Sequence, residues 1–206
     1  MRTGWGLEPF EEETRARGFP IIAGVDEAGR GPLAGPVVAA AVILPRVRKL
    51  KGIADSKLLT PAQREAAYGL IRKKAVSVGV GIVEAEEIDR LNILQASRKA
   101  MQLAVCHLFL FPDFLLVDGI HPIDLNLPQQ AIPQGDRRCL SIAAASIVAK
   151  VCRDRLMGIY HTEFPEYNFA RHKGYGTAEH LRALRRYGYC SIHRRSFKPV
   201  IQMPLL

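Results

Sequence analysis

One uninterrupted run of eight apolar residues, from 37 to 44, constrains the fold of this chain more than any other segment. The run is rich in β-branched side chains and closes on Pro45, a pattern typical of a β-strand. It is the longest apolar run in the chain, and it falls far short of the roughly twenty residues that span a bilayer. The sequence therefore predicts a sheet protein that is soluble and has no membrane association.

Strand and helix patterns alternate along the rest of the chain. Strands are expected over Ile21–Val25, 36–44, 76–83, Phe114–Val117 and Ala131–Ile132, and helices over 61–74, Ala85–Leu91, 93–110, 141–161 and Ala178–Tyr187. Hairpin-like strands come first and crossover helices follow, which predicts a mixed α/β fold. With no repeat, low-complexity tract or linker, the 206 residues are expected to form a single domain, 1–206.

Basic residues are concentrated near the end of the chain. The net charge is +9, and residues 150–198 contribute most of it, with eleven Lys or Arg against four Asp or Glu. A basic segment of this kind predicts contact with a polyanion, and the alternative is a solvated basic face. His172, His180 and His193 of this segment are expected at the surface or against phosphate. The four cysteines lack zinc-site spacing and are expected as free thiols, with Cys106 and Cys152 facing the core.

The sharpest local motif is the segment VDEAGRGP, in which an apolar strand runs into Asp26 and Glu27 and then into a glycine-rich turn. Adjacent strand residues point to opposite faces, so the two carboxylates can share a site only where the strand ends or bends. Carboxylates that lie close together repel unless a cation lies between them, and oxygen ligands favour hard cations such as Mg²⁺ or Mn²⁺. The alternative is a solvated acidic turn with Arg30 paired to a carboxylate.

Two further acids follow the same logic. Asp118 ends the apolar segment LLVD and precedes Gly119, and Asp136 lies just before the long helix predicted from position 141. Functional groups collect at strand ends in α/β sheets. The structural alternatives are turn chemistry at Asp118 and a helix-dipole contact at Asp136.

Other motifs are excluded or rejected. The segment GRGPLA (29–34) matches a dinucleotide fingerprint, but a strand and not a helix is predicted after it. Neither a phosphate-binding loop with the pattern GxxxxGK[ST] nor a GxSxG nucleophile elbow occurs in the sequence.

Seven segments between about Ile21 and Pro199 resemble bacterial type 2 ribonuclease H, the ribonuclease HII family. They are VDEAGRGPLAGPVVAAAV (25–42), DSKLL (55–59), LLVDG (115–119), GD (135–136), AAASIVAKVCRD (143–154), HKGYGT (172–177) and HRRSF (193–197). The resemblance implies a ribonuclease H-like fold, a central mixed five-stranded sheet flanked by helices. It also implies an N-terminal extension over about 1–20 and a basic helical C-terminal region over about 160–206. The short segment before the first strand disfavours the type 3 enzymes, which carry an additional N-terminal domain.

The resemblance also implies roles for individual residues. The family's four catalytic and metal-binding acids match Asp26, Glu27, Asp118 and Asp136. Its substrate-binding residues match Gly29, Arg30, Gly31, Lys57, Lys173, Tyr175 and Arg195, with Tyr175 as the tyrosine that reads the RNA-to-DNA junction. Relatives often carry Lys before the Gly-Asp pair, where this chain has Gln134, which affects one phosphate contact.

The implied activity is hydrolysis of the RNA strand of RNA–DNA hybrids, with incision 5′ of single ribonucleotides embedded in duplex DNA. Two Mg²⁺ or Mn²⁺ ions per site are expected with substrate, in a cytoplasmic monomer whose partner is nucleic acid. Two rivals remain at this point: a non-catalytic nucleic-acid-binding module, and a DNA nuclease or resolvase on the same fold.

Overall fold

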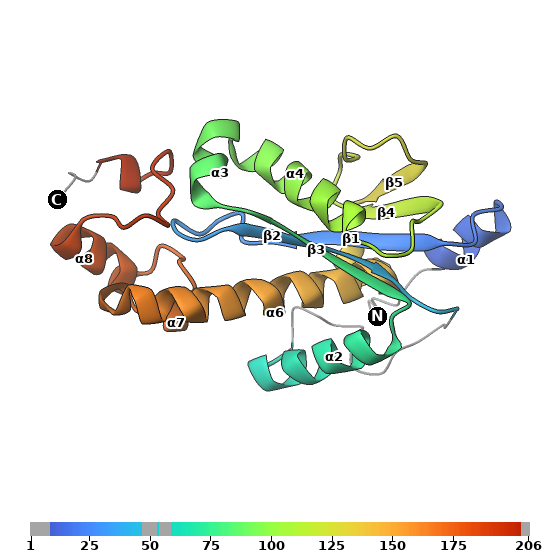
Figure 1. The fold of residues 1–206 in the computed structure, drawn as a ribbon, viewed down its shortest axis with the longest axis horizontal. Helices are drawn as coiled ribbons and strands as arrows, with labels where there is room; N and C mark the ends of the chain where they lie inside the picture. The colour runs from blue at the N-terminus through green and yellow to red at the C-terminus, as the bar shows by residue number, and fades with distance from the viewer. Residues whose placement is uncertain (1–8, 47–52, 54–58, 203–206) are drawn as a thin grey trace, which may run out of the picture.

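A five-stranded sheet forms the centre of the computed structural model, which describes residues 9–46, 53 and 59–202 (Figure 1). The strand order is β3-β2-β1-β4-β5. The strands are β1 (Ile22–Ala28), β2 (Val37–Ile43), β3 (Ser77–Val83), β4 (Phe114–Asp118) and β5 (Gln129–Ile132). The first three pair antiparallel, whereas β4 pairs in parallel with β1 and β5 in parallel with β4. The mixed five-stranded sheet flanked by helices is therefore confirmed.

Helices cover both faces of the sheet. In Figure 1, α3 (Ala85–Leu91) and α4 (Ile93–Cys106) lie on one face, and α6 (Leu140–Glu163) and α2 (Pro61–Lys74) lie on the other. The remaining helices are α1 (Phe10–Ala16), α5 (Gly135–Arg138), α7 (Phe169–His172) and α8 (Ala178–Tyr187), with 3₁₀ turns at Pro165–Tyr167 and Val200–Gln202. No described helix is both long and apolar enough to cross a membrane.

Local signals place several helix ends correctly. The Thr60 hydroxyl accepts the backbone N–H of Gln63, and the Gln63 side chain accepts the N–H of Thr60, so α2 begins with a complete capping box. The Thr177 hydroxyl caps α8 in the same way by accepting the N–H of His180. Both helix starts agree with the sequence prediction.

Two predictions about the helices need correction. The helix predicted over 93–110 ends at Cys106, because Leu108 turns into the core and the backbone N–H of Phe109 donates to the Ser77 hydroxyl. Cys106 is exposed and not core-facing, and Cys152 is only half-buried. Helix α6 lies between the sheet and α2 and is buried on more than one side. Towards its C-terminal end it buries Arg153 and Met157, whereas Ile159 is exposed.

The helices approach the sheet closely where the strands carry glycine. A Cβ at Gly79 or Gly81 of β3 would overlap the carbonyl oxygens of Ala104 and Ala100 of α4, respectively. A Cβ at Gly24 of β1 would overlap the backbone of Ser141 of α6. The glycines that weaken the strand pattern in the sequence are therefore the positions that let both helix layers pack against the sheet.

His172, His180 and His193 are buried, which contradicts the expectation that they lie at the surface. His180 is 0% exposed, and its ring stacks on that of His172 with the centroids 4.5 Å apart. The N–H of Cys190 donates to Nδ1 of His193, so the neutral His193 ring donates from Nε2 to Nε2 of His180, 3.0 Å away. Nδ1 of His180 then donates to the carbonyl of Tyr175. Burial among Tyr167, Phe169 and the neighbouring rings keeps this chain of imidazoles neutral.

The glycine contacts predict the stability of one variant and its control. Gly81→Ala is expected to lower the free energy of unfolding by about 1–3 kcal/mol, because the added methyl group overpacks the contact with α4. Gly69→Ala in α2, where no atom lies within 4 Å of the added Cβ, is expected to raise it by about 0.4–1 kcal/mol. Urea unfolding measures both, and equal effects of the two substitutions would contradict the close contact.

The buried imidazoles predict how stability depends on pH. Burial lowers the pKa of His180 to about 4 and that of His193 to about 3, from 6.5. Below about pH 6.5 the unfolded chain binds more protons than the folded protein, so the free energy of unfolding falls as the pH falls. Each of the two histidines contributes up to about 1.4 kcal/mol per pH unit to the slope of the free energy of unfolding against pH. Urea unfolding between about pH 7 and pH 5 should give a shallower slope for His180→Gln than for wild type. The exposed-site control His121→Gln should keep the wild-type slope, and an unchanged slope in His180→Gln would refute the assignment.

Candidate active site

Three carboxylates from two neighbouring strands converge at one edge of the sheet. Asp26 and Glu27 lie on β1, and Asp118 is the last residue of β4. Val25 lies opposite Val117 in the parallel pair, so the residues that follow, Asp26 and Asp118, lie side by side at this edge. One oxygen of each carboxylate lies within 4.8 Å of the other two. The structure thus brings together three acids that two separate sequence motifs supplied.

The two adjacent acids contribute to one site, and a backbone hydrogen bond helps to orient the first of them. β1 continues to Ala28, so both acids lie within the strand and not after it, where the sequence placed them. The backbone N–H of Glu27 donates to Oδ1 of Asp26 over 2.7 Å. This bond turns the buried Asp26 carboxylate towards the strand end, where Glu27 and Asp118 also lie.

Burial and mutual repulsion raise the pKa values of this cluster. For Asp26 the largest cause is desolvation, followed by the charges of Glu27 and Asp118, and a hydrogen bond from Ser146 of α6 opposes them. Desolvation also raises the pKa of Glu27, and the Arg30 guanidinium, 3.3 Å from its carboxylate, lowers it in part. In the described contacts, Arg30 pairs with one of these three carboxylates.

This donor set fits divalent metal ions. All the ligand atoms are carboxylate oxygens, which hard cations such as Mg²⁺ and Mn²⁺ prefer over softer metals. A cation among the three oxygens would remove the repulsion that raises the pKa of Asp26. The chemistry of the residues thus matches the sequence expectation of an oxygen-only metal site.

Asp136 lies beside this cluster but outside the group of three. It is buried on the short helix α5, whose first residue is tied to the cluster, because the backbone N–H of Gly135 donates to Oδ1 of Asp118 over 2.7 Å. The preceding residue, Gln134, adopts a left-handed conformation that starts this turn. The fourth predicted acid therefore lies next to the group of Asp26, Glu27 and Asp118, and its carboxylate is not one of the three that converge.

Two buried arginines, which sequence reasoning missed, hold the loop that follows β1. Arg194 donates to the carbonyls of Gly29, Arg30 and Gly35. Arg153 of α6 donates to the carbonyls of Ala34, Pro36 and Lys173. Both side chains are fully buried. The available sequence signal was an arginine within an otherwise apolar helix face at 153 and the first arginine of the pair in HRRSF at 194.

Tyr175 lies against this loop from a segment far along the chain. Its Cε1 atom is 3.8 Å from the position that a Cβ of Gly31 would occupy, so the ring lies directly beside this glycine at van der Waals distance. The ring is 44% exposed, and the guanidinium carbon of Arg153 lies 6.0 Å from its centroid. The N–H of Leu33 donates to the carbonyl of Gly174 and closes the contact between the two segments. The predicted substrate residues Gly29, Arg30, Gly31 and Tyr175 thus form one surface next to the carboxylates.

The other predicted substrate residues lie elsewhere. The Lys173 ammonium donates to the carbonyl of Asp154 in α6. The backbone N–H of Arg195 donates to Asp89 of α3, and its guanidinium lies over the ring of Tyr189. Lys57 falls outside the described residues. These contacts tie Lys173 and Arg195 to the protein and give no sign of a role at the carboxylates.

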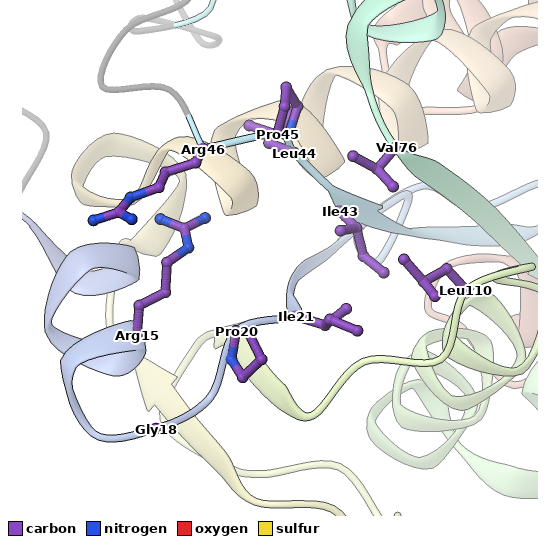
Figure 2. Close-up of a pocket in the computed structure, with 10 residues that line it drawn as sticks. All are labelled: Arg15, Gly18, Pro20, Ile21, Ile43, Leu44, Pro45, Arg46, Val76 and Leu110. Atoms are coloured by element: carbon purple, nitrogen blue, oxygen red, sulfur yellow. The ribbon is translucent and has the colours of Figure 1, made fainter.

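A cavity of about 550 Å³ lies at the opposite end of β1 from the acids. Figure 2 shows the guanidinium groups of Arg15 and Arg46 pointing into it, with apolar side chains such as Ile21 and Ile43 along its wall. Its described lining contains no Asp or Glu side chain.

Comparisons with known proteins agree on one family. The family model described as Ribonuclease HII matches residues 23–200. Ribonuclease HII of Syntrophus aciditrophicus is 56% identical over 193 residues, which cover 94% of this chain and 91% of that protein. Ribonuclease HII of Geobacter metallireducens is 56% identical over 194 residues, 94% of this chain and 91% of that protein.

Solved structures give the same result for the fold. Ribonuclease H2 from Pyrococcus horikoshii superposes with a TM-score of 0.76 at 27% identity, covering 88% of this chain and 96% of that one. Ribonuclease HII of Archaeoglobus fulgidus, solved as a complex with PCNA, gives a TM-score of 0.75 at 26% identity, covering 86% and 95%. The chain therefore belongs to the ribonuclease HII family and is a hydrolase of the ribonuclease H class.

Proposed function

We propose that this protein hydrolyses the RNA strand of RNA–DNA hybrids and cuts 5′ of single ribonucleotides embedded in duplex DNA. The observation that carries the proposal is the position of the acidic group Asp26, Glu27 and Asp118 directly beside the Gly29–Gly31 loop. A site that holds metal-binding oxygens next to exposed backbone can act on a phosphodiester and read the sugar beside it. We infer that residues 1–206 act as a single catalytic unit, a monomer in the cytoplasm.

Asp26, Glu27 and Asp118 would hold two divalent ions, and Asp136 would complete the set when substrate is present. When bound, the ions supply an activated water and stabilise the oxygen that leaves in an in-line displacement. The chain itself fixes the carboxylates: Ser146 and the Glu27 N–H hold Asp26, and the Gly135 N–H holds Asp118. Mg²⁺ and Mn²⁺ both suit these oxygens.

The Gly29–Gly31 loop is the element best placed to recognise ribose. Only the 2′-hydroxyl distinguishes RNA from DNA at a given sugar, and it can both donate and accept a hydrogen bond. Glycine leaves no Cβ between the backbone and the sugar. Because Arg194 holds the carbonyls of Gly29 and Arg30 from the protein side, the loop is ordered before substrate binds.

Tyr175 would stack on the sugar next to the ribonucleotide. Its ring is partly exposed beside Gly31, and its backbone carbonyl is held by His180. A deoxyribose lacks the 2′-hydroxyl and offers an apolar edge to an aromatic ring. The pair of Gly31 and Tyr175 can therefore read a ribose followed by a deoxyribose, which is the junction in ribonucleotide-containing DNA.

The basic C-terminal region would supply affinity that does not depend on sequence. Helix α8 carries Arg182, Arg185 and Arg186, and phosphate contacts of such residues make binding weaken steeply with salt. A DNA nuclease on the same fold would share this property, so affinity alone does not separate the two activities. Duplex DNA with one ribonucleotide, tested with and without Mg²⁺ or Mn²⁺, does so, because a DNA nuclease also cuts the all-DNA control.

Asp26→Asn tests the acidic group. The substitution keeps shape but removes a ligand charge, so cleavage of a hybrid should fall by more than about a hundredfold, since even indirect partners of a metal ligand cost about 10–100-fold. Metal at about 100 times its dissociation constant should stabilise wild type by about 2.7 kcal/mol, and much less in the variant. Asp124→Asn, an exposed carboxylate outside the group, is the control. Cleavage by Asp26→Asn at nearly the wild-type rate would show that the assignment is wrong.

Tyr175→Ala tests the reading of the junction. The rate should fall more on duplex DNA with one embedded ribonucleotide than on a long RNA–DNA hybrid, because only the first substrate requires the ring to rest on a deoxyribose. Base or sugar stacking on an aromatic ring is worth about 1–3 kcal/mol, which corresponds to roughly tenfold or more. Tyr189→Ala, whose ring lies under Arg195 in the same region, is the control. Equal losses on both substrates would remove the proposed role.

A further inference from the structure

A second cavity opens directly beside the acidic group, on the side of α4. It has a volume of about 270 Å³, and Glu27 and Asp118 form one part of its lining. Helix α4 contributes Ser97, Arg98 and Met101 to the wall. This volume leaves room for a hydrated phosphate group.

Arg98 is the residue of this cavity that the described contacts leave without a role. Its Nε atom is buried and has no hydrogen-bond partner within the described part of the chain. A guanidinium carries five donors, and a buried donor without an acceptor is rare in folded proteins. The neighbouring cation Lys99 differs, because its ammonium lies 2.6 Å from the Glu87 carboxylate. Arg98 is therefore the cation of α4 that is positioned for an external anion.

The rest of the lining supports an anion flanked by a sugar. His121 contributes an imidazole, and Arg30 lies at the boundary with the acidic group, where it pairs with Glu27. Leu94 and Ile120 are exposed apolar side chains of the same lining. An anion bound against such walls is less screened than one in open solvent, which strengthens its attraction to Arg98.

We propose that this cavity is a phosphate subsite in which Arg98 binds a non-scissile phosphate of the duplex, with Leu94 and Ile120 against the adjoining sugar. The inference rests on the proposed function, because the phosphate belongs to a substrate whose scissile bond lies at Asp26, Glu27 and Asp118. It adds a specific contact that positions the strand, since a phosphate held at a fixed place beside the acids fixes which bond reaches them.

The test measures binding and not turnover. The affinity for an RNA–DNA hybrid is determined between about 50 and 200 mM salt. The parent protein carries Asp26→Asn, which blocks cleavage, and each of two further variants adds Arg98→Met or Lys99→Met to it. Loss of one phosphate contact should reduce the slope of log affinity against log salt by about 0.9. The factor by which the affinity falls over this salt range should therefore be about 3.5 times smaller for Arg98→Met than for the parent. Lys99→Met is the matched control on the same helix and should keep the parental slope.

A second measurement identifies the phosphate. Methylphosphonates replace single phosphates of the hybrid in turn, each removing one charge. At one position near the scissile bond the neutral linkage should weaken binding of the parent but add nothing in Arg98→Met, because both changes remove the same contact.

An unchanged salt slope in Arg98→Met, an equal reduction in Lys99→Met, or additive effects at every methylphosphonate would overturn the subsite. Failure of the proposed function would look different: the parent itself would show no affinity for the hybrid, or wild type would leave the hybrid intact with metal.

Discussion

The parallel pairing of β1 with β4 is the constraint on which the site depends. Parallel strands end at the same edge of a sheet, so a register that sets Val25 opposite Val117 carries Asp26 and Asp118 to one place although ninety-two positions separate them. The close approach of α6 to Gly24 then brings Ser146 within reach of Asp26. A shift of one residue in this pairing would send one of the acids to the other face of the sheet.

The buried charges of the site reduce the stability of the folded protein. The pKa of Asp26 is raised because its charge is buried beside two others. Behind the adjoining loop, burial lowers the pKa of Arg194 to about 9, with the charge of Arg153 as a further cause. Both arginines remain charged at neutral pH, and in the described contacts their hydrogen bonds go to carbonyl oxygens and not to carboxylates. Buried charges of this kind cost free energy unless they are satisfied, and the carbonyl groups offset part of that cost.

Local chemistry in the sequence predicted most of the elements and named the three acids as candidates, and the resemblance to the ribonuclease HII family selected them. Helix N-caps such as Thr60 and Thr177 bond to the residue three positions later, so they can be predicted directly from the local sequence. The burial of His172, His180 and His193 could not be read in this way. Their burial results from packing between separate turns of the C-terminal region, because the ring of His180 stacks on that of His172 and is hydrogen-bonded to that of His193.

The same limit applies to the two arginines. Nothing near position 153 or 194 in the chain indicates that these guanidinium groups will meet the carbonyls of 29–36, because the contacts span 117 to 165 positions. The sequence therefore predicted which residues could do the chemistry. The residues that hold them in place depend on tertiary packing, which a local pattern does not contain.

These contacts explain how a loop with two glycines can serve as a recognition surface. Gly29 and Gly31 leave the backbone bare, which a sugar needs, but glycine loses more conformational freedom than other residues when it is ordered. Arg153, Arg194 and the backbone bridge between Ala34 and His193 impose that order in the folded protein. The ordering of the loop is then part of folding and not of substrate binding. The proposed recognition of a single hydroxyl would therefore not require the substrate to immobilise the loop first.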